Sequence, residues 1–334
     1  MKYKVGMIGG SYNPLHLGHL NTIISSANQC EELYIVLSVT QQKDEIDYHE
    51  RYMWLKTLTQ DLENVKVIIN FDNSKNKEVY NWEQGRDDII NQINKPIDVV
   101  FAGSDYKEKN IWEKLYPNSK IVYYERDEVN ISSTEIRTNP YKYYDYLPKI
   151  VQNYYLKKVC IIGTESCGKT TLVRNLAKYF NTSYVEEAGR LICDEAGGID
   201  NMQKKHYFEI LFKQKELEKQ SITTARKVLI IDTDSLITLY YYQLGFSNQD
   251  KEFKNIAESI SYLNNYDLYL FLEPDVEWIQ DGTRTYGDDL VRQENNIKLK
   301  QLLKENNIKY ETITGDYQDR YTKSKTLIKK LIGE

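Results

Sequence analysis

The chain has 334 residues, of which 41% are hydrophobic and 28% are charged, and its formal net charge is −5 at pH 7. This length exceeds one average domain, and this composition is that of a globular protein rather than a disordered or fibrous one. The negative charge gives no support to a general affinity for nucleic acid, and no apolar run approaches the roughly 20 residues that cross a bilayer.

The first half of the chain alternates short apolar runs with longer segments of mixed polarity. We expect strands at 4–8, 33–39, 65–70, 98–102 and 120–124, with helices between them. Such alternation predicts a parallel sheet with helices on both faces. The stretch NPYKYYDYLPKIVQNYYLKK, residues 139–158, is expected to form a helix that ends this domain, so we place the domains at 1–155 and 156–334.

The second half repeats the pattern. Buried strands are expected at 158–163, 227–232, 267–273 and 309–315, again separated by helical segments. The fold class is therefore α/β, with two three-layer, parallel-sheet domains in tandem. The four cysteines have no paired spacing, which predicts free thiols, a cytoplasmic protein and no structural zinc site. They are Cys30, Cys160, Cys167 and Cys193.

The first candidate site is GGSYNPLHLGHL, residues 9–20, which follows the first strand and leads into a helix expected near Gly18. Ligands of parallel sheets bind beyond the carboxyl ends of the strands. The glycines let the backbone approach a phosphate, and the helix amino terminus adds N–H donors and partial positive charge. His16 and His19 then donate hydrogen bonds to phosphate oxygens instead of acting as nucleophiles. Two ordinary loop histidines are the alternative, which the full spacing Gly-x-Tyr-x-Pro-x-His-x-Gly-His disfavours.

This stretch resembles the H-x-G-H signature of nucleotidyltransferases, which transfer a nucleotidyl group from ATP to a phosphate or similar acceptor. ISSTEIR, residues 131–137, resembles their second signature. The resemblance implies that Ser133 and Thr134 lie on the triphosphate at a helix amino terminus and that Arg137 neutralises its charge. Hydroxyls capping a helix that carries an arginine one turn later also form an anion site by their own chemistry. The ATP contacts expected in this domain are Gly9, Gly10, Ser11, Tyr12, Gly18, Gly103, Asp105, Ser133 and Thr134.

The stretch FAGSD, residues 101–105, follows the fourth strand, where this superfamily binds adenosine. Gly103 permits a close backbone approach and Asp105 can accept a ribose hydroxyl. Trp54 and Trp82 either stack on a heteroaromatic ring, with Trp82 as a candidate substrate residue, or pack in the core. Weaker candidates for phosphate contacts are Lys43 and Arg126.

The second candidate site is GTESCGKT, residues 163–170, which fits G-x-x-x-x-G-K-[ST] between a strand and a helix. In such a phosphate loop, backbone N–H groups cradle phosphates, Lys169 reaches the terminal ones and Thr170 binds Mg²⁺. KVLIIDTD supplies the second acidic strand, with Asp232 as the candidate metal residue. Which of Asp232 and Asp234 holds the metal and which orients or deprotonates the acceptor stays open. The expected nucleotide contacts are Gly163, Glu165, Ser166, Cys167, Gly168, Thr170 and Thr171.

Two further segments bear on phosphoryl transfer. DGTRTYGDDLVR, residues 281–292, predicts a mobile lid in which Arg284 and Arg292 stabilise the transferring group, and a solvated loop is the alternative. In YVEEAGR, residues 184–190, Glu187 and Arg190 are spaced to share one helix face. They face either sugar hydroxyls or a cationic ring of the substrate, or they form a surface ion pair.

The order of the two domains, together with ISSTEIRTNP and EEAGR, resembles the NadR family of nicotinamide-nucleotide enzymes over nearly the whole chain. The resemblance implies a carboxyl-terminal kinase that uses ATP and Mg²⁺ to phosphorylate nicotinamide riboside to nicotinamide mononucleotide (NMN). It also implies an amino-terminal adenylyltransferase that joins NMN and ATP into NAD and pyrophosphate. Some members begin with a helix-turn-helix repressor domain, but the first strand here starts by Lys4. We therefore expect no DNA partner and no membrane partner, and a homo-oligomer is left open.

Two other functions compete with this interpretation. A bifunctional coenzyme A synthase also joins a phosphopantetheine adenylyltransferase to a dephospho-coenzyme A kinase, but its adenylyltransferase usually has threonine in place of His16. A regulator that senses nucleotides without turnover would not need the candidate catalytic residues that both domains carry.

Overall fold

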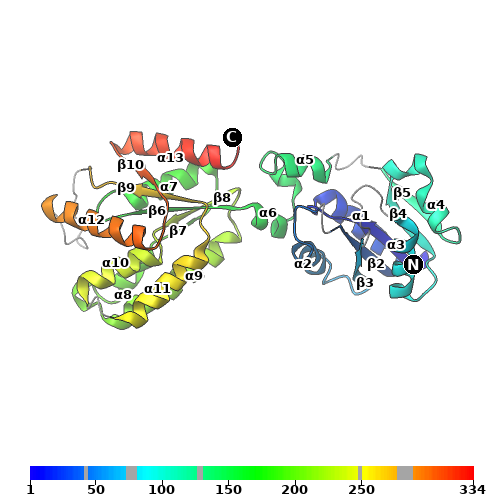
Figure 1. The fold of residues 1–334 in the computed structure, drawn as a ribbon, viewed down its shortest axis with the longest axis horizontal. Coiled ribbons are helices and arrows are strands. Elements are labelled where there is room, and N and C mark those ends of the chain that lie inside the picture. The colour runs from blue at the N-terminus through cyan, green and yellow to red at the C-terminus, as the bar shows by residue number, and fades with distance from the viewer. Residues whose placement is uncertain (41–43, 73–80, 126–130, 247–249, 277–288) are drawn as a thin grey trace. The chain divides into compact units, whose positions relative to one another are not determined.

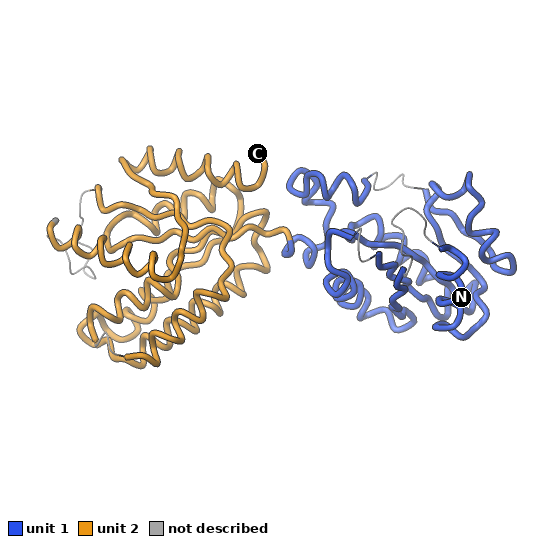
Figure 2. The backbone as a smooth tube through the Cα atoms, in the orientation of Figure 1, with its two compact units in different colours: residues 1–154 blue, residues 155–334 orange. Residues whose placement is uncertain are grey.

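The computed structural model describes residues 1–40, 44–72, 81–125, 131–246, 250–276 and 289–334. It divides into two compact units, Met1–Tyr154 and Tyr155–Glu334 (Figure 2). Each unit is built on a five-stranded sheet in which every neighbouring pair of strands is parallel. Within the described residues, no helix combines the length and the apolar character that crossing a membrane requires. The expected α/β class with two parallel sheets is confirmed.

Unit 1 has the strand order β3-β2-β1-β4-β5. Because β2 and β4 flank β1 on opposite sides, the direction of winding reverses at β1, and such a reversal opens a crevice beyond the strand ends. The strands are β1 (Tyr3–Gly10), β2 (Cys30–Val39), β3 (Val65–Phe71), β4 (Val99–Gly103) and β5 (Lys120–Tyr124). The helices are α1 (Leu17–Ala27), α2 (Tyr48–Leu58), α3 (Trp82–Ile93), α4 (Ile111–Leu115), α5 (Ser133–Thr138) and α6 (Lys149–Tyr155), of which α6 runs into unit 2.

Unit 2 has the strand order β10-β9-β6-β8-β7, with β6 at the centre. Its strands are β6 (Lys157–Gly163), β7 (Tyr184–Val185), β8 (Val228–Asp232), β9 (Leu268–Leu272) and β10 (Glu311–Ile313). Its helices are α7 (Lys169–Phe180), α8 (Ala188–Glu195), α9 (Lys204–Ile222), α10 (Ser235–Gly245), α11 (Lys251–Asn264), α12 (Asp289–Glu305) and α13 (Tyr317–Leu331). In Figure 1, α7 and α13 cover one face of this sheet, and α9, α10 and α11 cover the other.

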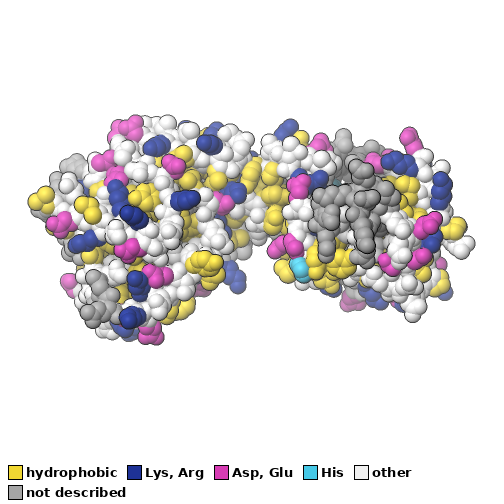
Figure 3. Space-filling view, viewed as in Figure 1, with side chains coloured by type: hydrophobic (Ala, Val, Ile, Leu, Met, Phe, Trp, Pro, Cys, Tyr) yellow, Lys and Arg dark blue, Asp and Glu magenta, His cyan; other side chains and the backbone are white. Residues whose placement is uncertain are grey.

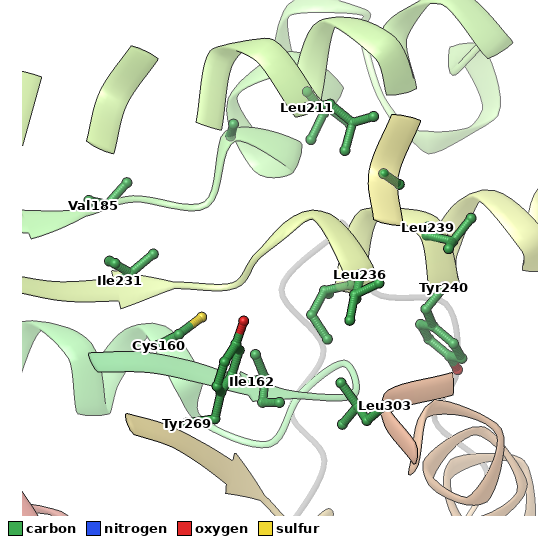
Figure 4. Close-up of a cluster of buried hydrophobic side chains, with 14 of the residues drawn as sticks. Cys160, Ile162, Val185, Leu211, Ile231, Leu236, Leu239, Tyr240, Tyr269 and Leu303 are labelled. Carbon is green, nitrogen blue, oxygen red and sulfur yellow. The ribbon is translucent and has the colours of Figure 1, made fainter. Parts of the chain in front are cut away.

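Alternating side chains of the central strand β6 enter two separate cores. Val159 and Ile161 pack into the cluster with α7 and α13. Cys160 and Ile162 pack into the cluster that includes Leu236 of α10 (Figure 4). A strand buried on both faces has an uninterrupted apolar sequence, which explains why these strands stand out as runs.

The segment 139–158 is not the single helix that we expected. It contains a short 3₁₀ turn at Tyr144–Tyr146 and the helix α6, and β6 already begins at Lys157. Pro148 supplies the reason, because a proline disfavours helical geometry in the residue before it. The same proline accepts the first backbone hydrogen bonds of α6 from Val151 and Gln152, both at 2.9 Å. All four cysteines are free thiols, as expected.

Candidate functional site

In unit 1, the loop between β1 and α1 presents two stacked imidazole rings. His16 is buried and precedes α1, and His19 lies in the first turn of that helix. Their ring centroids are 3.7 Å apart, and Nδ1 of His19 accepts a hydrogen bond from the backbone N–H of His16 at 3.4 Å. A neutral His19 therefore carries its proton on Nε2. The ring of the buried Tyr12 packs edge-to-face with the ring of His19, and the two ring centroids are 5.1 Å apart. Both imidazoles thus sit at a helix amino terminus, where an anion is favoured.

The second signature segment contacts this loop directly. The hydroxyl of Ser133 donates to the carbonyl of Pro14 at 3.0 Å, and the guanidinium of Arg137 donates to the carbonyl of Asn13. Arg137 also donates to the Thr134 hydroxyl at 3.2 Å. The structure therefore brings together the two segments that the sequence pairs only by resemblance.

The helix cap in this segment differs from the expected one. Ser132, not Ser133 or Thr134, precedes α5, and its hydroxyl accepts the backbone N–H of Glu135 at 3.2 Å. The Glu135 carboxylate returns the contact by accepting the backbone N–H of Ser132 at 2.8 Å. The pattern S-x-x-E is a capping box, and in ISSTEIR the first of the two serines satisfies it. Ser133 and Thr134 are consequently the first two residues of the helix itself.

Gly103, at the end of β4, borders open space, because a Cβ atom built on it would meet nothing within 4 Å. Asp105 lies exposed in the 3₁₀ turn Ser104–Lys109 that follows. Trp82, the first residue of α3, is half-buried and contacts the ring of Trp112 edge-on at 5.8 Å. Trp54 is buried in the core, with 1% of its surface exposed, so it packs rather than stacks on a ligand. Lys43 and Arg126 lie outside the described residues.

Sequence reasoning missed Arg51, a fully buried arginine of α2 that supports the loop from behind. Its Nη1 donates to the carbonyl of Ser11 at 2.6 Å, and its Nη2 pairs with the carboxylate of Asp44 at 2.7 Å. Asp44 in turn accepts the backbone N–H of Thr40 at 2.8 Å. Because it supports the loop through the backbone carbonyl of a residue 40 positions away, no spacing in the sequence reveals this role.

We expect Arg51→Met to destabilise unit 1 by about 3 kcal/mol, because it leaves the Asp44 carboxylate without its buried partner. The measurement is urea unfolding followed by tryptophan fluorescence, which reports mainly on unit 1, where three of the four tryptophans lie. Arg86→Met is the matched control, because its ion pair with Asp87 lies at the surface, and a change below about 1 kcal/mol is expected there. Equal effects of the two substitutions would contradict the buried role of Arg51.

In unit 2, the phosphate loop joins β6 to α7 and encloses its lysine. Gly163 has φ +150°, and a Cβ atom there would lie 2.7 Å from the carbonyl oxygen of Leu272 in β9. Gly168 has φ +83° immediately before α7. The ammonium of Lys169 is buried and donates to the carbonyl of Thr164 at 2.8 Å. The two glycine positions of the loop pattern thus need glycine for close packing at Gly163 and for left-handed backbone geometry at Gly168.

The structure separates the two acidic residues at the end of β8, of which Asp232 is the last residue of the strand and Asp234 precedes α10. The hydroxyl of Thr170 donates to Oδ2 of Asp232 at 2.6 Å, whereas Oδ1 of Asp232 has no hydrogen-bond partner among the described residues. Burial, and next the nearby Glu187, raise the pKa of Asp232 to about 7. Asp234 has both oxygens engaged: Oδ1 caps α10 through the N–H groups of Leu236 and Ile237 at 3.0 and 3.2 Å, and Oδ2 accepts the Tyr269 hydroxyl at 3.0 Å.

A cavity of about 510 Å³ extends from the phosphate loop between α8, α9 and α10. Glu187, which directly precedes α8, and Arg190 in its first turn both line it, as do Glu165, Lys169 and Thr170 of the phosphate loop. Its other walls are largely apolar and aromatic. They include Met202, Tyr207, Ile237, Tyr241 and Phe246. The cavity therefore combines phosphate-loop residues that suit an anion with apolar and aromatic walls that suit a ring.

A buried glutamine of α9, which sequence reasoning also missed, anchors the start of α8 next to Glu187. The side-chain oxygen of Gln214 accepts the backbone N–H of Ala188 at 2.8 Å. Its amide nitrogen donates to the carbonyl of Asp232 at 3.1 Å. One side chain thus holds the start of α8 against the end of β8, on the wall of the cavity.

Only part of the predicted lid lies within the described residues. Arg284 lies in 277–288, outside the described residues. Arg292 lies on α12, is buried, and donates to the carbonyl of Val276 at 3.0 Å, beyond the end of β9. It is not among the residues that line the cavity, which differs from the expected position over the phosphates. Arg292 instead contacts the segment that follows β9.

The described part of the chain contains no group of three or more histidine, cysteine or acidic side chains arranged to hold a metal ion. Magnesium does not require such a cage, because it keeps several waters and binds through one or two protein oxygens together with substrate phosphates. Thr170 and the unpartnered Oδ1 of Asp232 fit that mode of binding.

Comparison with known proteins agrees with the architecture of both units. Residues 7–139 match the cytidylyltransferase-like family and residues 158–320 match the AAA domain family. Over 352 residues the chain is 27% identical to the trifunctional NAD biosynthesis/regulator protein NadR of Escherichia coli (strain K12), covering 100% of this chain and 84% of that protein.

Two solved structures share the fold over almost the whole length. A crystal structure of NadR protein in complex with NR superposes with a TM-score of 0.82 at 22% identity, covering 100% of this chain and 97% of that one. A second, in complex with NAD and AMP-PNP, gives a TM-score of 0.81 at 20% identity, with coverage of 99% and 96%. The two domain matches in this order and the similarity along the full length of the chain make it similar to NadR in both of its units.

Proposed function

We propose that this chain is a bifunctional enzyme of NAD salvage. Unit 2 phosphorylates nicotinamide riboside with ATP to give NMN, and unit 1 joins NMN to ATP to give NAD and pyrophosphate. The observation that carries the proposal is the presence of one phosphate-binding site in each unit of a chain similar to NadR along its full length. The relatives bound to NR and to NAD with AMP-PNP supply the identity of the ligands.

For the kinase, the cavity provides both substrates with suitable surroundings. The phosphate loop and Lys169 bind the ATP phosphates, and the 5′-hydroxyl of the riboside attacks the γ-phosphorus as ADP leaves. Glu187 lines the cavity next to the backbone N–H that Gln214 accepts, and its carboxylate can accept hydrogen bonds from the ribose hydroxyls. Mg²⁺ on Thr170 and Asp232 would neutralise charge on the β- and γ-phosphates.

For the adenylyltransferase, the phosphate of NMN attacks the α-phosphorus of ATP and pyrophosphate leaves. The attacking group is already anionic, so the step needs no protein nucleophile and no general base. His16 and His19 donate hydrogen bonds to phosphate oxygens, while Arg137 and the amino termini of α1 and α5 offset the negative charge. Gly103 leaves room for the adenosine.

The products of one incubation test the proposal. The purified protein, ATP, Mg²⁺ and nicotinamide riboside should yield NMN, ADP, pyrophosphate and NAD, identified by mass spectrometry. A parallel incubation with phosphopantetheine and ATP should yield no dephospho-coenzyme A. Product from the second incubation alone would favour a coenzyme A synthase, and absence of product from both would favour a regulator without turnover.

We expect Asp232→Asn to lower kinase turnover about 100-fold or more, because it removes the charge that faces Thr170 and the metal. Asp234→Asn should retain turnover within about threefold, because asparagine caps a helix as well as aspartate does. The two variants change the same charge two residues apart, so each controls for the other. Steady-state kinetics of riboside phosphorylation decide between them, and a larger loss in Asp234→Asn would reverse the assignment.

We further expect no sequence-specific DNA binding by this chain. Its net charge is −5, and on the face shown in Figure 3 basic and acidic side chains are interspersed over both units rather than gathered into a basic patch. Binding of a duplex library at about 0.15 M salt with excess competitor should therefore give no retained sequence. Specific retention under these conditions would contradict the expectation.

A further inference from the structure

A second buried arginine, Arg320 of α13, holds the phosphate loop of unit 2 from outside the cavity. Its guanidinium donates to the carbonyl of Cys167 within the loop and, through Nε, to the carbonyl of Gly315 at 2.7 Å. It also donates to the carbonyl of Glu273 at 2.8 Å and forms an ion pair with Asp275. Only 1% of Arg320 is exposed. A single side chain therefore joins the phosphate loop, the segment after β9 and the loop before α13.

The contact with Cys167 determines where the next backbone N–H points. In a planar trans peptide, the C=O of one residue and the N–H of the next point in opposite directions. Because the carbonyl of Cys167 is directed at Arg320, the N–H of Gly168 is directed away from it. Gly168 lines the cavity, and the ring of Tyr317 backs it, since a Cβ atom on Gly168 would lie 3.2 Å from Cε1 of that ring. In a phosphate loop, backbone N–H groups of this kind hold the phosphates.

The contact with Glu273 ties the same guanidinium to α12. The carboxylate of Glu273 accepts a hydrogen bond from Asn296 at 2.7 Å and pairs with Lys300 at 2.6 Å, and both residues lie on α12. An arginine fork suits this geometry, because its planar donors can serve three carbonyls and a carboxylate at fixed angles. A lysine ammonium in its place would satisfy fewer of them.

We propose that Arg320 is a positioning residue of the kinase site, which orients the Cys167–Gly168 peptide so that the Gly168 N–H faces the nucleotide phosphates. The inference rests on the proposed kinase function of unit 2. It predicts a defect that is confined to the nucleotide, because the walls that would receive the riboside come from α8, α9 and α10 and none of the contacts of Arg320 reaches them.

The test is the kinetics of Arg320→Lys in the full-length chain. The KM for ATP in riboside phosphorylation should rise about tenfold or more, which is the scale of a lost hydrogen bond to a charged group, while the KM for nicotinamide riboside stays within about twofold. NAD formation from supplied NMN should not change. Lys323→Met is the control for general effects of substitution on α13, because it removes a cationic side chain of the same helix at an exposed residue, which donates to the carbonyl of Thr312. It should leave both KM values unchanged.

Each outcome decides between the proposals. If the wild-type chain phosphorylates no riboside, the proposed function fails. If it does so and Arg320→Lys has the wild-type KM for ATP, or an equal rise in both KM values, Arg320 does not position the phosphate loop. Should Arg320→Lys not fold, Asp275→Asn takes its place, because it removes the carboxylate that pairs with the guanidinium and so weakens the hold on Arg320 without altering Arg320 itself. A rise in the KM for ATP alone would support the role, and unchanged kinetics would overturn it.

Discussion

Lys169→Ala is expected to lower riboside phosphorylation by about three orders of magnitude, because it removes the buried positive charge of the phosphate loop that would stabilise the transferring phosphoryl group. The ammonium is buried and its hydrogen bond to the Thr164 carbonyl keeps it inside the phosphate loop. Formation of NAD from supplied NMN and ATP should continue at the wild-type rate, since the candidate residues for that reaction all lie in unit 1. Separate assays of the two half-reactions make the measurement.

Lys178→Ala is the matched control for this variant. It makes the same change of charge on the same helix, α7, but at an exposed residue, so both activities should persist. Retention of kinase activity in Lys169→Ala would refute the phosphate-loop assignment. Loss of both activities in a folded Lys169→Ala protein would show that the two sites are not independent.

The strands were predictable because each parallel sheet buries its central strands on both faces. The run KVCIIG at 158–163 corresponds to β6, Lys157–Gly163, and its alternate residues fill two different cores. The last strand is shorter than the predicted 309–315 and spans Glu311–Ile313. Gly315, with φ +93°, turns the chain away from the strand before that run ends. An apolar run locates a strand, but it does not show at which residue the strand ends.

The candidate sites were predictable where the chemistry is local. Glycines at fixed spacing mark both phosphate-binding loops, with histidines in the loop of unit 1 and a lysine in that of unit 2, because those loops are made from consecutive residues. Arg51, Gln214 and Arg320 escaped notice because they contact backbone carbonyls or amides contributed by distant segments. No pattern of side chains in the sequence identifies a backbone partner. From the sequence alone, a buried arginine cannot be distinguished from an ordinary surface arginine.

The sequence Asp-Thr-Asp at the end of β8 gives a second example of contacts that the sequence does not reveal, here between neighbouring residues. Both carboxylates end an apolar run, and the sequence does not show which oxygens the backbone uses. The structure separates them, because Asp234 gives one oxygen to the start of α10 and the other to Tyr269. Asp232 keeps one oxygen without a partner among the described side chains and backbone groups. The distinction depends on the capping of α10 by Asp234, which a pattern of three residues does not encode.

His19→Ala is expected to lower adenylyl transfer by about 100-fold or more, with riboside phosphorylation unchanged, so that NMN accumulates from nicotinamide riboside. The substitution removes an N–H donor at the amino terminus of α1 and also the ring that stacks on His16 at 3.7 Å. His49→Ala is the matched control, because it removes an exposed imidazole of the same unit that pairs with Asp47. It should leave both activities intact.

The effect of these substitutions on kcat, compared with their effect on the KM for ATP, then shows whether the imidazoles act in the transition state or in ground-state binding. A hydrogen bond that strengthens only as charge develops on the phosphate oxygens lowers kcat when it is lost and leaves the KM for ATP nearly unchanged. We expect that result for His16→Ala as well, because its ring lies against that of His19 at the same helix terminus. If kcat stays constant while the KM for ATP rises, the pair contributes ground-state binding only. If His19→Ala makes NAD at the wild-type rate, the H-x-G-H segment is not the adenylyl-transfer site.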